Sequence, residues 1–320
     1  PREVLSGRIT AGPDGSFEIS IDTSPDKTLL RDMNIDKAVY AVTADVTSAS
    51  GETRSSAVDI PAGAVPLFLS MSAPEWLSEN ETIEIDIAGA DISGKPSTGE
   101  CKLEICRLRG PDAPVRKEYG LCQRSYLEEK ATAARCKDGV KAGISASFDP
   151  EHWPAVETIT TENILIGTSG RAKVLLRLKA GAYKAILYNE SASTGAGIGN
   201  ETSCVLIVFN ERSPRFGVSV PFHFAAQKTS VEPGCVFRAF AACGYDSGRI
   251  LINISRDGET VKRYWTAKGE TAHLVEFAAG EEFCGGFTVS AGLVRDNIFY
   301  ESKIRVDVPF VSKKLDIKLD

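Results

Sequence analysis

Hydrophobic and polar residues alternate over short stretches along most of the chain, as they do in half-buried β-strands. The stretch 40–54 shows the pattern most clearly, because alternate residues fall on opposite faces before a turn at 50–51. A second strand follows this turn, so we expect a β-hairpin over 38–60. One face of its first strand holds Tyr40, Val42, Ala44 and Val46, and the other holds Ala41, Thr43, Asp45 and Thr47.

The same period of two recurs from one end of the chain to the other. In the first two thirds it predicts strands at 3–10, 16–22, 81–88, 101–109, 171–179, 181–188 and 204–209. In the last third it predicts strands at 219–227, 235–243, 249–256, 260–266, 271–277, 286–294 and 298–308. Turn residues separate them, notably Gly12-Pro13-Asp14-Gly15 and the two-residue hairpin signal Asp257-Gly258.

The expected fold is therefore all-β, a series of seven-stranded sandwiches of the immunoglobulin or fibronectin type III kind. A length of 320 residues suggests two or three domains. Short linkers are expected at 61–64 and 210–217. We expect a first or partial sandwich over 1–64, a second over 65–214, a third over 215–308, and a terminal strand or new domain over 309–320.

Residues 110–165 interrupt this rhythm with prolines, glycines and polar residues. The segment 123–136 has the composition of a short helix. We therefore interpret 110–165 as an irregular, partly helical insertion in the middle domain. A sandwich does not need such an insertion, so it is our choice for an interdomain or partner contact.

Composition narrows the class of function. The chain is 42% hydrophobic and 25% charged, with a formal net charge of −6. These values are typical of a globular protein and give no basic footprint for nucleic acid. No apolar run approaches the roughly 18 residues that a membrane-spanning helix needs, so direct membrane insertion is not expected. The chain starts at Pro1 in strand-like sequence, and we interpret it as a fragment of a longer, exported protein.

Eight cysteines are spread irregularly, and none forms a Cys-x-x-Cys pair that would favour a zinc ribbon. We favour buried free thiols that pack as small hydrophobic side chains. One or two disulfides, involving Cys122 and Cys136 of the irregular segment and with the pairing left open, are the alternative. The cysteines are Cys101, Cys106, Cys122, Cys136, Cys204, Cys235, Cys243 and Cys284.

Residues of the types that carry catalysis do not cluster along the sequence. The three histidines, His152, His223 and His273, lie in three different segments. No Gly-x-Ser-x-Gly elbow occurs, and the glycines of 195–199 lead into no helix, so we interpret them as a flexible turn. We expect no catalytic, cofactor or metal site, and therefore no enzyme.

Large aromatic residues are the better candidates for contacts. We expect Trp76, Trp153, Trp265 and Tyr264 to serve interdomain or partner contacts. Tyr264 and Trp265 are adjacent on one expected strand, so they face opposite ways. One ring then belongs to the core, and the other is free for a surface role such as a carbohydrate platform.

Several phrases resemble those of bacterial alpha-2-macroglobulin family proteins. They follow one another in the expected order over nearly the whole chain. Two hairpin phrases come first, at 7–19 and 40–54, the second with Ser48 where the family usually has aspartate. The others lie at 103–108, 149–153, 178–183, 231–234, 244–245, 285–288, 306–309 and 314–318.

The resemblance implies consecutive seven-stranded macroglobulin domains from a protease trap. In that family a bait segment is cut, the protein rearranges, and in many members a thioester captures the attacker. The thioester lies in a Cys-x-Glu-Gln sequence, which none of the eight cysteines here begins. The resemblance therefore implies structural arch domains, with the bait and thioester outside this chain.

The resulting hypothesis is a non-enzymatic part of a protease inhibitor in the periplasm or at the cell surface, with lipoprotein anchoring of the full-length protein left open. Its partners would be neighbouring macroglobulin domains and, through the whole protein, target proteases. The alternative is a cell-surface adhesin or glycan-binding array of sandwiches.

Overall fold

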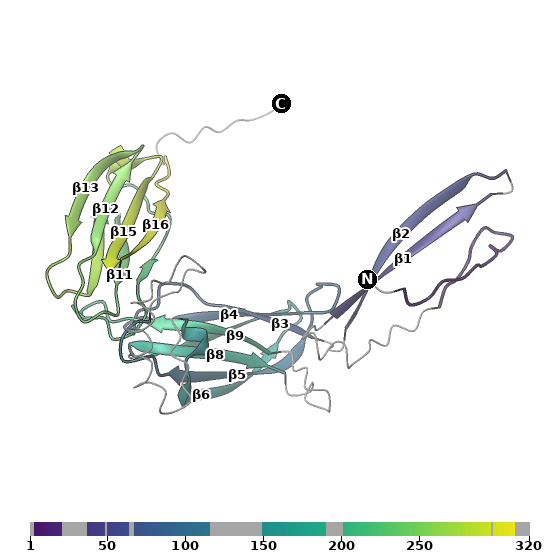
Figure 1. The fold of residues 1–320 in the computed structure, drawn as a ribbon, viewed down its shortest axis with the longest axis horizontal. Helices are drawn as coiled ribbons and strands as arrows, with labels where there is room; N and C mark the ends of the chain where they lie inside the picture. The colour runs from purple at the N-terminus through teal and green to yellow at the C-terminus, as the bar shows by residue number, and fades with distance from the viewer. Residues whose placement is uncertain are drawn as a thin grey trace, which may run out of the picture.

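The computed structural model describes residues 3–20, 37–48, 50–63, 67–115, 149–189, 201–295 and 297–310. Its strands form five sheets, and every pair of neighbouring strands is antiparallel. Four of these sheets make two sandwiches, and the fifth is a hairpin (Figure 1). The all-β fold class is therefore confirmed.

The hairpin consists of β1 (Lys37–Thr47) and β2 (Thr53–Gly63), paired in register over eleven positions. Gly51 has a φ of +85°, which lets the turn close between Ser48 and Glu52, whose N···O distance is 2.8 Å. β2 continues to Gly63, so the linker expected at 61–64 is wrong up to that residue. Pro61 is tolerated because a two-stranded sheet leaves one edge of each strand without a ladder partner.

The strands expected at 3–10 and 16–22 do not form within residues 3–20. The turn between them does form, because Gly15 has a φ of +81° and the amide of Gly12 donates to the carbonyl of Ser16 at 2.8 Å. Ile9 and Ile19 on the two flanks are 58% and 44% exposed, so little burial supports a ladder.

The first sandwich has a three-stranded and a four-stranded sheet. The first sheet has the order β3-β4-β7, and the second has the order β6-β5-β8-β9. A one-turn 3-10 helix, η1 (Pro150–His152), precedes β6. The strands are β3 (Phe68–Ser72), β4 (Ile83–Ala90), β5 (Gly99–Leu108), β6 (Ala155–Ile166), β7 (Arg171–Leu176), β8 (Gly181–Tyr188) and β9 (Glu201–Val208).

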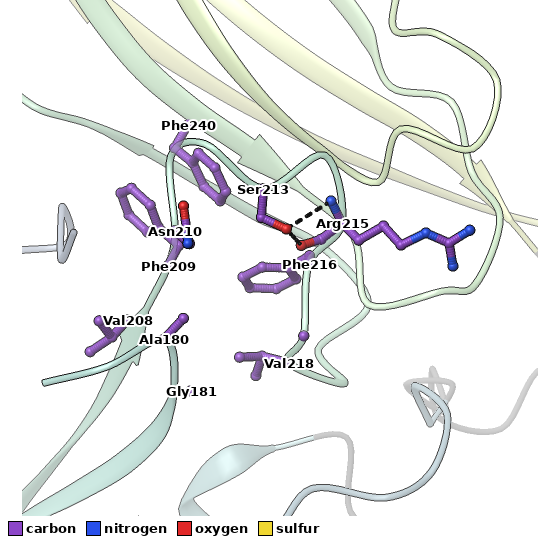
Figure 2. Close-up of a pocket in the computed structure, with 11 residues that line it drawn as sticks. Ala180, Gly181, Val208, Phe209, Asn210, Ser213, Arg215, Phe216, Val218 and Phe240 are labelled. Atoms are coloured by element: carbon purple, nitrogen blue, oxygen red, sulfur yellow. Dashed lines mark hydrogen bonds between the residues drawn. The ribbon is translucent and has the colours of Figure 1, made fainter. Parts of the chain in front are cut away.

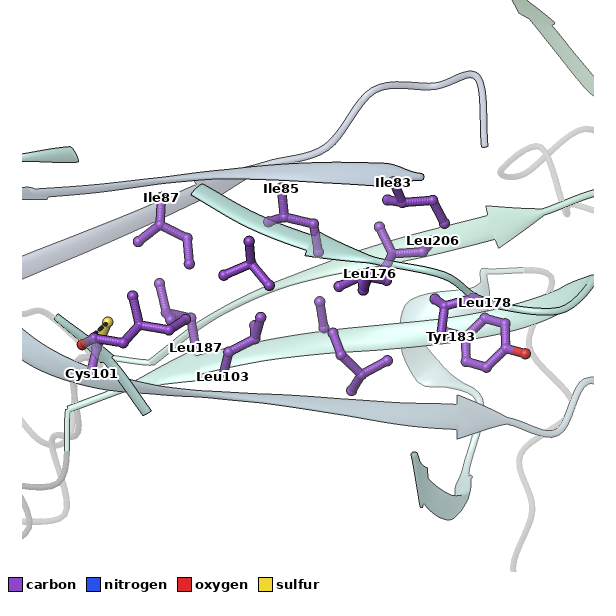
Figure 3. Close-up of a cluster of buried hydrophobic side chains, with 14 of the residues drawn as sticks. Ile83, Ile85, Ile87, Cys101, Leu103, Leu176, Leu178, Tyr183, Leu187 and Leu206 are labelled. Atoms are coloured by element: carbon purple, nitrogen blue, oxygen red, sulfur yellow. Dashed lines mark hydrogen bonds between the residues drawn. The ribbon is translucent and has the colours of Figure 1, made fainter. Parts of the chain in front are cut away.

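The alternating residues of both sheets meet in one core (Figure 3). Ile83, Ile85 and Ile87 of β4 are at most 3% exposed and point toward the opposite sheet. Leu103 and Leu187 approach them from the four-stranded sheet. Burying each such side chain contributes about 1.5–3 kcal/mol, so this period-two pattern fixes which face of each strand turns inward.

The irregular insertion expected at 110–165 is wrong for its last part, because 155–165 lie in β6. This strand pairs with β5, with register shifts beside Cys106 and Leu108. Most of its side chains are exposed on both faces, so the sequence carries no alternation there. The helix expected at 123–136 lies outside the described residues.

The second sandwich repeats the arrangement. Its sheets have the orders β10-β11-β14 and β13-β12-β15-β16, and a 3-10 helix, η3 (Glu281–Phe283), precedes β15. All seven strands expected here are confirmed in position. They are β10 (His223–Ala226), β11 (Val236–Ala242), β12 (Leu251–Arg256), β13 (Glu259–Trp265), β14 (Ala272–Ala278), β15 (Phe287–Arg295) and β16 (Ile298–Val306).

Local chemistry explains the hairpin between β12 and β13. Asp257 and Gly258 have φ values of +49° and +86°, as the central pair of a type I′ turn requires. Asp tolerates this left-handed region better than most residues, and Gly adopts it without steric cost. The hairpin signal in the sequence is therefore confirmed.

The six cysteines within the described residues form no disulfide. Burial raises the pKa of the Cys101 thiol to about 11 and also raises those of Cys204 and Cys243. Such thiols pack as hydrophobic groups and hold little thiolate near neutral pH. All six are free thiols, as expected, but the expected burial is confirmed only for Cys101, Cys106 and Cys243, since Cys204 and Cys284 are partly exposed and Cys235 is exposed. Cys122 and Cys136 lie outside the described residues.

Candidate functional site: the joint between the sandwiches

Residues 209–222, between β9 and β10, form the connecting segment, which is hydrogen-bonded to both sandwiches. The amide of Phe209 donates to the carbonyl of Leu77 at 2.9 Å, which ties the start of this segment to the first sandwich. Farther along, the carbonyl of Pro214 accepts from the amide of Thr271 at 2.9 Å, in the second sandwich. We call the contact region between the two sandwiches the joint.

The centre of the joint is an aromatic stack. Phe209, at the end of the first sandwich, stacks on Phe240 of β11 with ring centroids 4.0 Å apart and planes 6° apart. Trp76 packs its edge against Phe209 at 4.9 Å. Trp76, Phe209 and Phe240 are all at most 7% exposed. Rings from the two sandwiches therefore share one buried cluster, which also contains Ala242 and Ala272.

A polar bridge surrounds this stack. The indole Nε1 of Trp76 donates to Glu81 Oε2 at 3.0 Å, and Gln227 Nε2 donates to Glu81 Oε1 at 2.9 Å. Glu81 belongs to the first sandwich and Gln227 to the second. One carboxylate thus fixes the indole and holds both sandwiches at once, with charge-assisted bonds that are stronger than neutral ones.

An ion pair adds to the same side of the joint. Arg238 of β11 donates to Glu211 in the connecting segment at 2.6 Å and to Glu276 of β14 at 3.2 Å. Its guanidinium also lies 5.8 Å from the centroid of the Trp76 ring. The Arg238 and Glu211 side chains are only 28% and 12% exposed, so solvent screens this pair less than an open surface pair.

A second apolar cluster lies at another part of the joint. Trp153, which follows η1, packs with Leu108 and Ala182 of the first sandwich and with Val218 and Val220 of the connecting segment. A Cβ at Gly110 would stand 2.8 Å from the Trp153 ring, so the absence of a side chain there lets the indole approach the backbone closely.

A cavity of about 210 Å³ lies beside the aromatic stack. Figure 2 draws the residues that line it. Phe209, Phe216 and Phe240 line it together with Val208 and Val218. Asn210 and Ser213 add polar groups to its wall. In the view of Figure 2 the Arg215 side chain extends away from the rings, while its backbone bonds to Ser213.

His223, the first residue of β10, lies against this aromatic wall. Its ring centroid is 5.9 Å from that of Phe216, at 13° between planes, and 6.0 Å from that of Phe209. The residue as a whole is partly exposed, but its Nε2 atom is enclosed and has no hydrogen-bond partner among the described residues. Burial lowers the pKa of His223 to about 4, because an apolar setting disfavours the imidazolium.

The joint brings together two of the four aromatic residues singled out from the sequence, Trp76 and Trp153, each in its own cluster. Tyr264 and Trp265 lie elsewhere, on β13. Tyr264 packs against the core of the second sandwich, and Trp265 is 49% exposed with the Arg249 guanidinium 5.8 Å from its ring. The side chains of Tyr264 and Trp265 therefore point to opposite faces of β13, as expected.

The remaining histidines have separate surroundings. His273 lies between Glu270, 2.6 Å from its Nδ1, and the Tyr264 hydroxyl, 3.2 Å from its Nε2. Burial raises the pKa of Tyr264, so its hydroxyl stays protonated and serves this hydrogen-bonded chain. His152 lies on η1, with its side chain 69% exposed.

The contact roles of Phe209 and Phe240 and the enclosed setting of His223 could not be predicted from the sequence pattern. Phe209 ends an expected strand and Phe240 alternates within another, so each pattern indicated only a core residue. Their stacking depends on how two sandwiches meet. No period within either sandwich encodes that contact.

Within the described ranges, no group of three or more His, Cys, Asp and Glu residues is placed to hold a metal ion. The same ranges contain no helix long and apolar enough to cross a membrane.

Comparison with known proteins gives similarity to structures only. No protein-family model matches the chain, and no curated protein sequence matches it. The native alpha-2-macroglobulin of E. coli matches with a TM-score of 0.27 and 11% identity over 85% of this chain and 17% of its own. Salmonella alpha-2-macroglobulin reacted with methylamine matches with a TM-score of 0.25 and 8% identity, over 85% of this chain and 27% of its own.

A transglutaminase of red sea bream also matches, with a TM-score of 0.25 and 7% identity over 76% of this chain and 31% of its own. The chain thus spans less than a third of the length of each of these structures. Overlaps this loose do not separate an inhibitor from an enzyme, and they assign no family.

Proposed function

We propose that the chain is a structural, non-enzymatic section of a macroglobulin-like protease inhibitor. The observation that carries the proposal is the joint. Two sandwiches of similar build share buried aromatic clusters, a bridging carboxylate and a partly buried ion pair. Such a contact would make the two sandwiches move as one rigid body, as a structural section needs if it is to transmit a conformational change.

The assignment to a macroglobulin-like protein rests on the short sequence motifs that resemble that family. They follow the order of macroglobulin domains along the chain, with proposed domains at 1–64, 65–214, 215–308 and 309–320. The proposed protein is exported to the periplasm or cell surface of a bacterium. Its partners are the neighbouring domains and, through the whole protein, the proteases that it traps. Bait cleavage and covalent capture belong to other parts of that protein.

The test uses the whole protein that contains this chain. It is incubated with a panel of endoproteases, and their activity is measured on a protein substrate and on a small chromogenic peptide. A trap protects the protein substrate more than the peptide and carries the protease with it in size-exclusion chromatography. Equal hydrolysis of both substrates, without co-elution, would contradict the proposal.

The adhesin or glycan-binding alternative predicts another outcome. Among the tryptophans of the described residues, Trp76 and Trp153 are buried, whereas Trp265 on β13 is 49% exposed and within reach of a sugar. Binding of the purified chain to a glycan array, lost in a Trp265→Ala variant, would favour this alternative over the trap.

A further inference from the structure

The strongest feature outside the proposed function is the histidine at the joint. His223 touches rings from three parts of the chain: Phe209 at the end of the first sandwich, Phe216 in the connecting segment, and Phe240 in the second sandwich. Its ring therefore has contacts on both sides of the joint. A change in its charge acts where the two sandwiches meet.

The geometry makes the imidazolium unfavourable there. In the cation both ring nitrogens carry a proton, so Nε2 must donate a hydrogen bond. Nε2 is enclosed and has no acceptor among the described residues. Its neighbours are apolar ring faces and edges, and an unmet donor in such surroundings destabilises the folded arrangement.

A cavity lies on the far side of the rings that enclose His223, which does not itself line it. Phe209, Phe216 and Phe240, the three rings around His223, all line the cavity of about 210 Å³. A void of this volume holds several water molecules, since one water occupies roughly 30 Å³ of the liquid. Parting the rings would therefore hydrate the imidazolium and break the stack between the sandwiches.

We propose that His223 is an acid-sensitive latch, which holds the two sandwiches together while neutral and loosens the joint when protonated. The inference rests on the contacts of the joint alone. It stands or falls separately from the protease-trap proposal.

The other charged groups near His223 are engaged elsewhere: Glu81 binds Trp76 and Gln227, and the Glu79 carboxylate accepts from the amide of Ala180. Strand β10 itself carries no other titratable side chain. On the elements packed against His223, Glu211 pairs with Arg238, Arg238 also pairs with Glu276, and the Arg215 side chain extends away from the rings. Arg212 is exposed, and His273 on β14 is engaged by Glu270 and Tyr264. Burial is the cause of the lowered His223 pKa, and no charged side chain within the described residues adds to it.

The sign of the pH effect follows from the two protonation states. The pKa of His223 falls from 6.5 to about 4 in the closed joint, so the open joint binds the proton more tightly. The closed state is fully favoured above pH 6.5 and loses this advantage as the pH falls toward 4. If opening restores the ordinary pKa, the opening equilibrium rises about twentyfold between neutral pH and pH 5.

The experiment compares the wild type with His223→Phe by small-angle X-ray scattering between pH 7 and pH 4. Phe keeps a flat ring and removes the titration. We expect the wild type to expand as the pH falls below 6.5, and the variant to expand less. His152→Phe is the matched control, because that histidine is exposed on η1, and it should behave as the wild type. Equal expansion of wild type and His223→Phe would overturn the proposal.

A second measurement on the wild type covers the case in which His223→Phe does not fold. Histidine ring protons are followed by NMR through the same pH range, together with hydrogen exchange at the Trp76 indole, which is bonded to Glu81. We expect His223 to titrate well below 6.5 and the indole to exchange faster as it does so. An ordinary His223 pKa, or an indole whose protection does not change, would also overturn the latch.

Discussion

At the scale of single residues, a few positions depend on how closely two backbones approach. Gly244 donates its amide to the carbonyl of Val220 at 2.9 Å, where the connecting segment passes the end of β11. A Cβ at Gly244 would lie 2.3 Å from the Val218 carbonyl oxygen and 2.7 Å from that of Val220. Both obstacles are backbone atoms, so neither can rotate out of the way.

Gly244→Ala should therefore lower the free energy of unfolding. The expected loss is about 1–3 kcal/mol, the usual cost of forcing an extra carbon into a packed site. Urea denaturation followed by tryptophan fluorescence measures it. Gly217→Ala is the matched control in the same region, because a Cβ there meets nothing within 4 Å. A Gly244→Ala variant as stable as Gly217→Ala would contradict this account of the site.

At the scale of elements, hairpin turns show local sequence deciding local structure. Gly258 has a φ of +86° in the two-residue turn between β12 and β13. Left-handed backbone of this kind costs an L-residue with a Cβ about 1–2 kcal/mol. The strand pair itself is fixed by Ile252 and Ile254, which are buried in the core of the second sandwich.

Gly258→Ala should destabilise the second sandwich by about 1–2 kcal/mol without changing its strand pairing. Thermal unfolding monitored by circular dichroism gives the size of the effect, and amide exchange of β12 and β13 reports the pairing. Gly167→Ala serves for comparison, since a Cβ at Gly167 would meet nothing within 4 Å and its φ is not positive. Equal melting of the two variants would show that the turn geometry is not under strain.

The strands of the second sandwich could be predicted from the sequence because each has one buried and one exposed face. Ile252 and Ile254 on β12 alternate with Leu251 and Asn253, and this period of two is visible in any strand of that kind. β6 could not be predicted, since side chains on both of its faces, such as Val156 and Ile159, are exposed. Only its last residues, Ile164 and Ile166, turn a face into the core, and two positions are too few to establish a hydrophobic period.

The joint illustrates a second limit. That Trp76 and Trp153 would serve contacts was an interpretation of their size alone. Which residues they meet depends on the relative placement of two separately patterned sandwiches. The enclosed Nε2 of His223 is likewise a property of that placement. Sequence periodicity describes each sandwich by itself and says nothing of their contact.

At the scale of the whole molecule, the joint determines whether the sandwiches behave as one body. Trp76 contributes an indole that packs on Phe209 and donates to Glu81, which also binds Gln227. Its removal would take away apolar contact and leave the bridging carboxylate with one donor fewer. Each sandwich keeps its own core, which does not include Trp76.

Trp76→Ala should therefore separate the unfolding of the two sandwiches. We expect differential scanning calorimetry to resolve two transitions for the variant where the wild type shows one, with a loss of about 3–5 kcal/mol at the joint. Trp265→Ala removes an equally large but half-exposed ring and should leave the profile close to that of the wild type. Identical profiles for both variants would mean that the joint does not couple the sandwiches.

The connecting segment has one further consequence, for proteolysis. Its carbonyls and amides bond to both sandwiches: Phe209 to Leu77, Pro214 to Thr271, and Val220 to Gly244. A nick between 210 and 217 would sever the covalent chain but leave these bonds and the aromatic clusters in place. Two bands on a denaturing gel would then correspond to one particle in native sizing, so an intact-looking molecule could already have been cut.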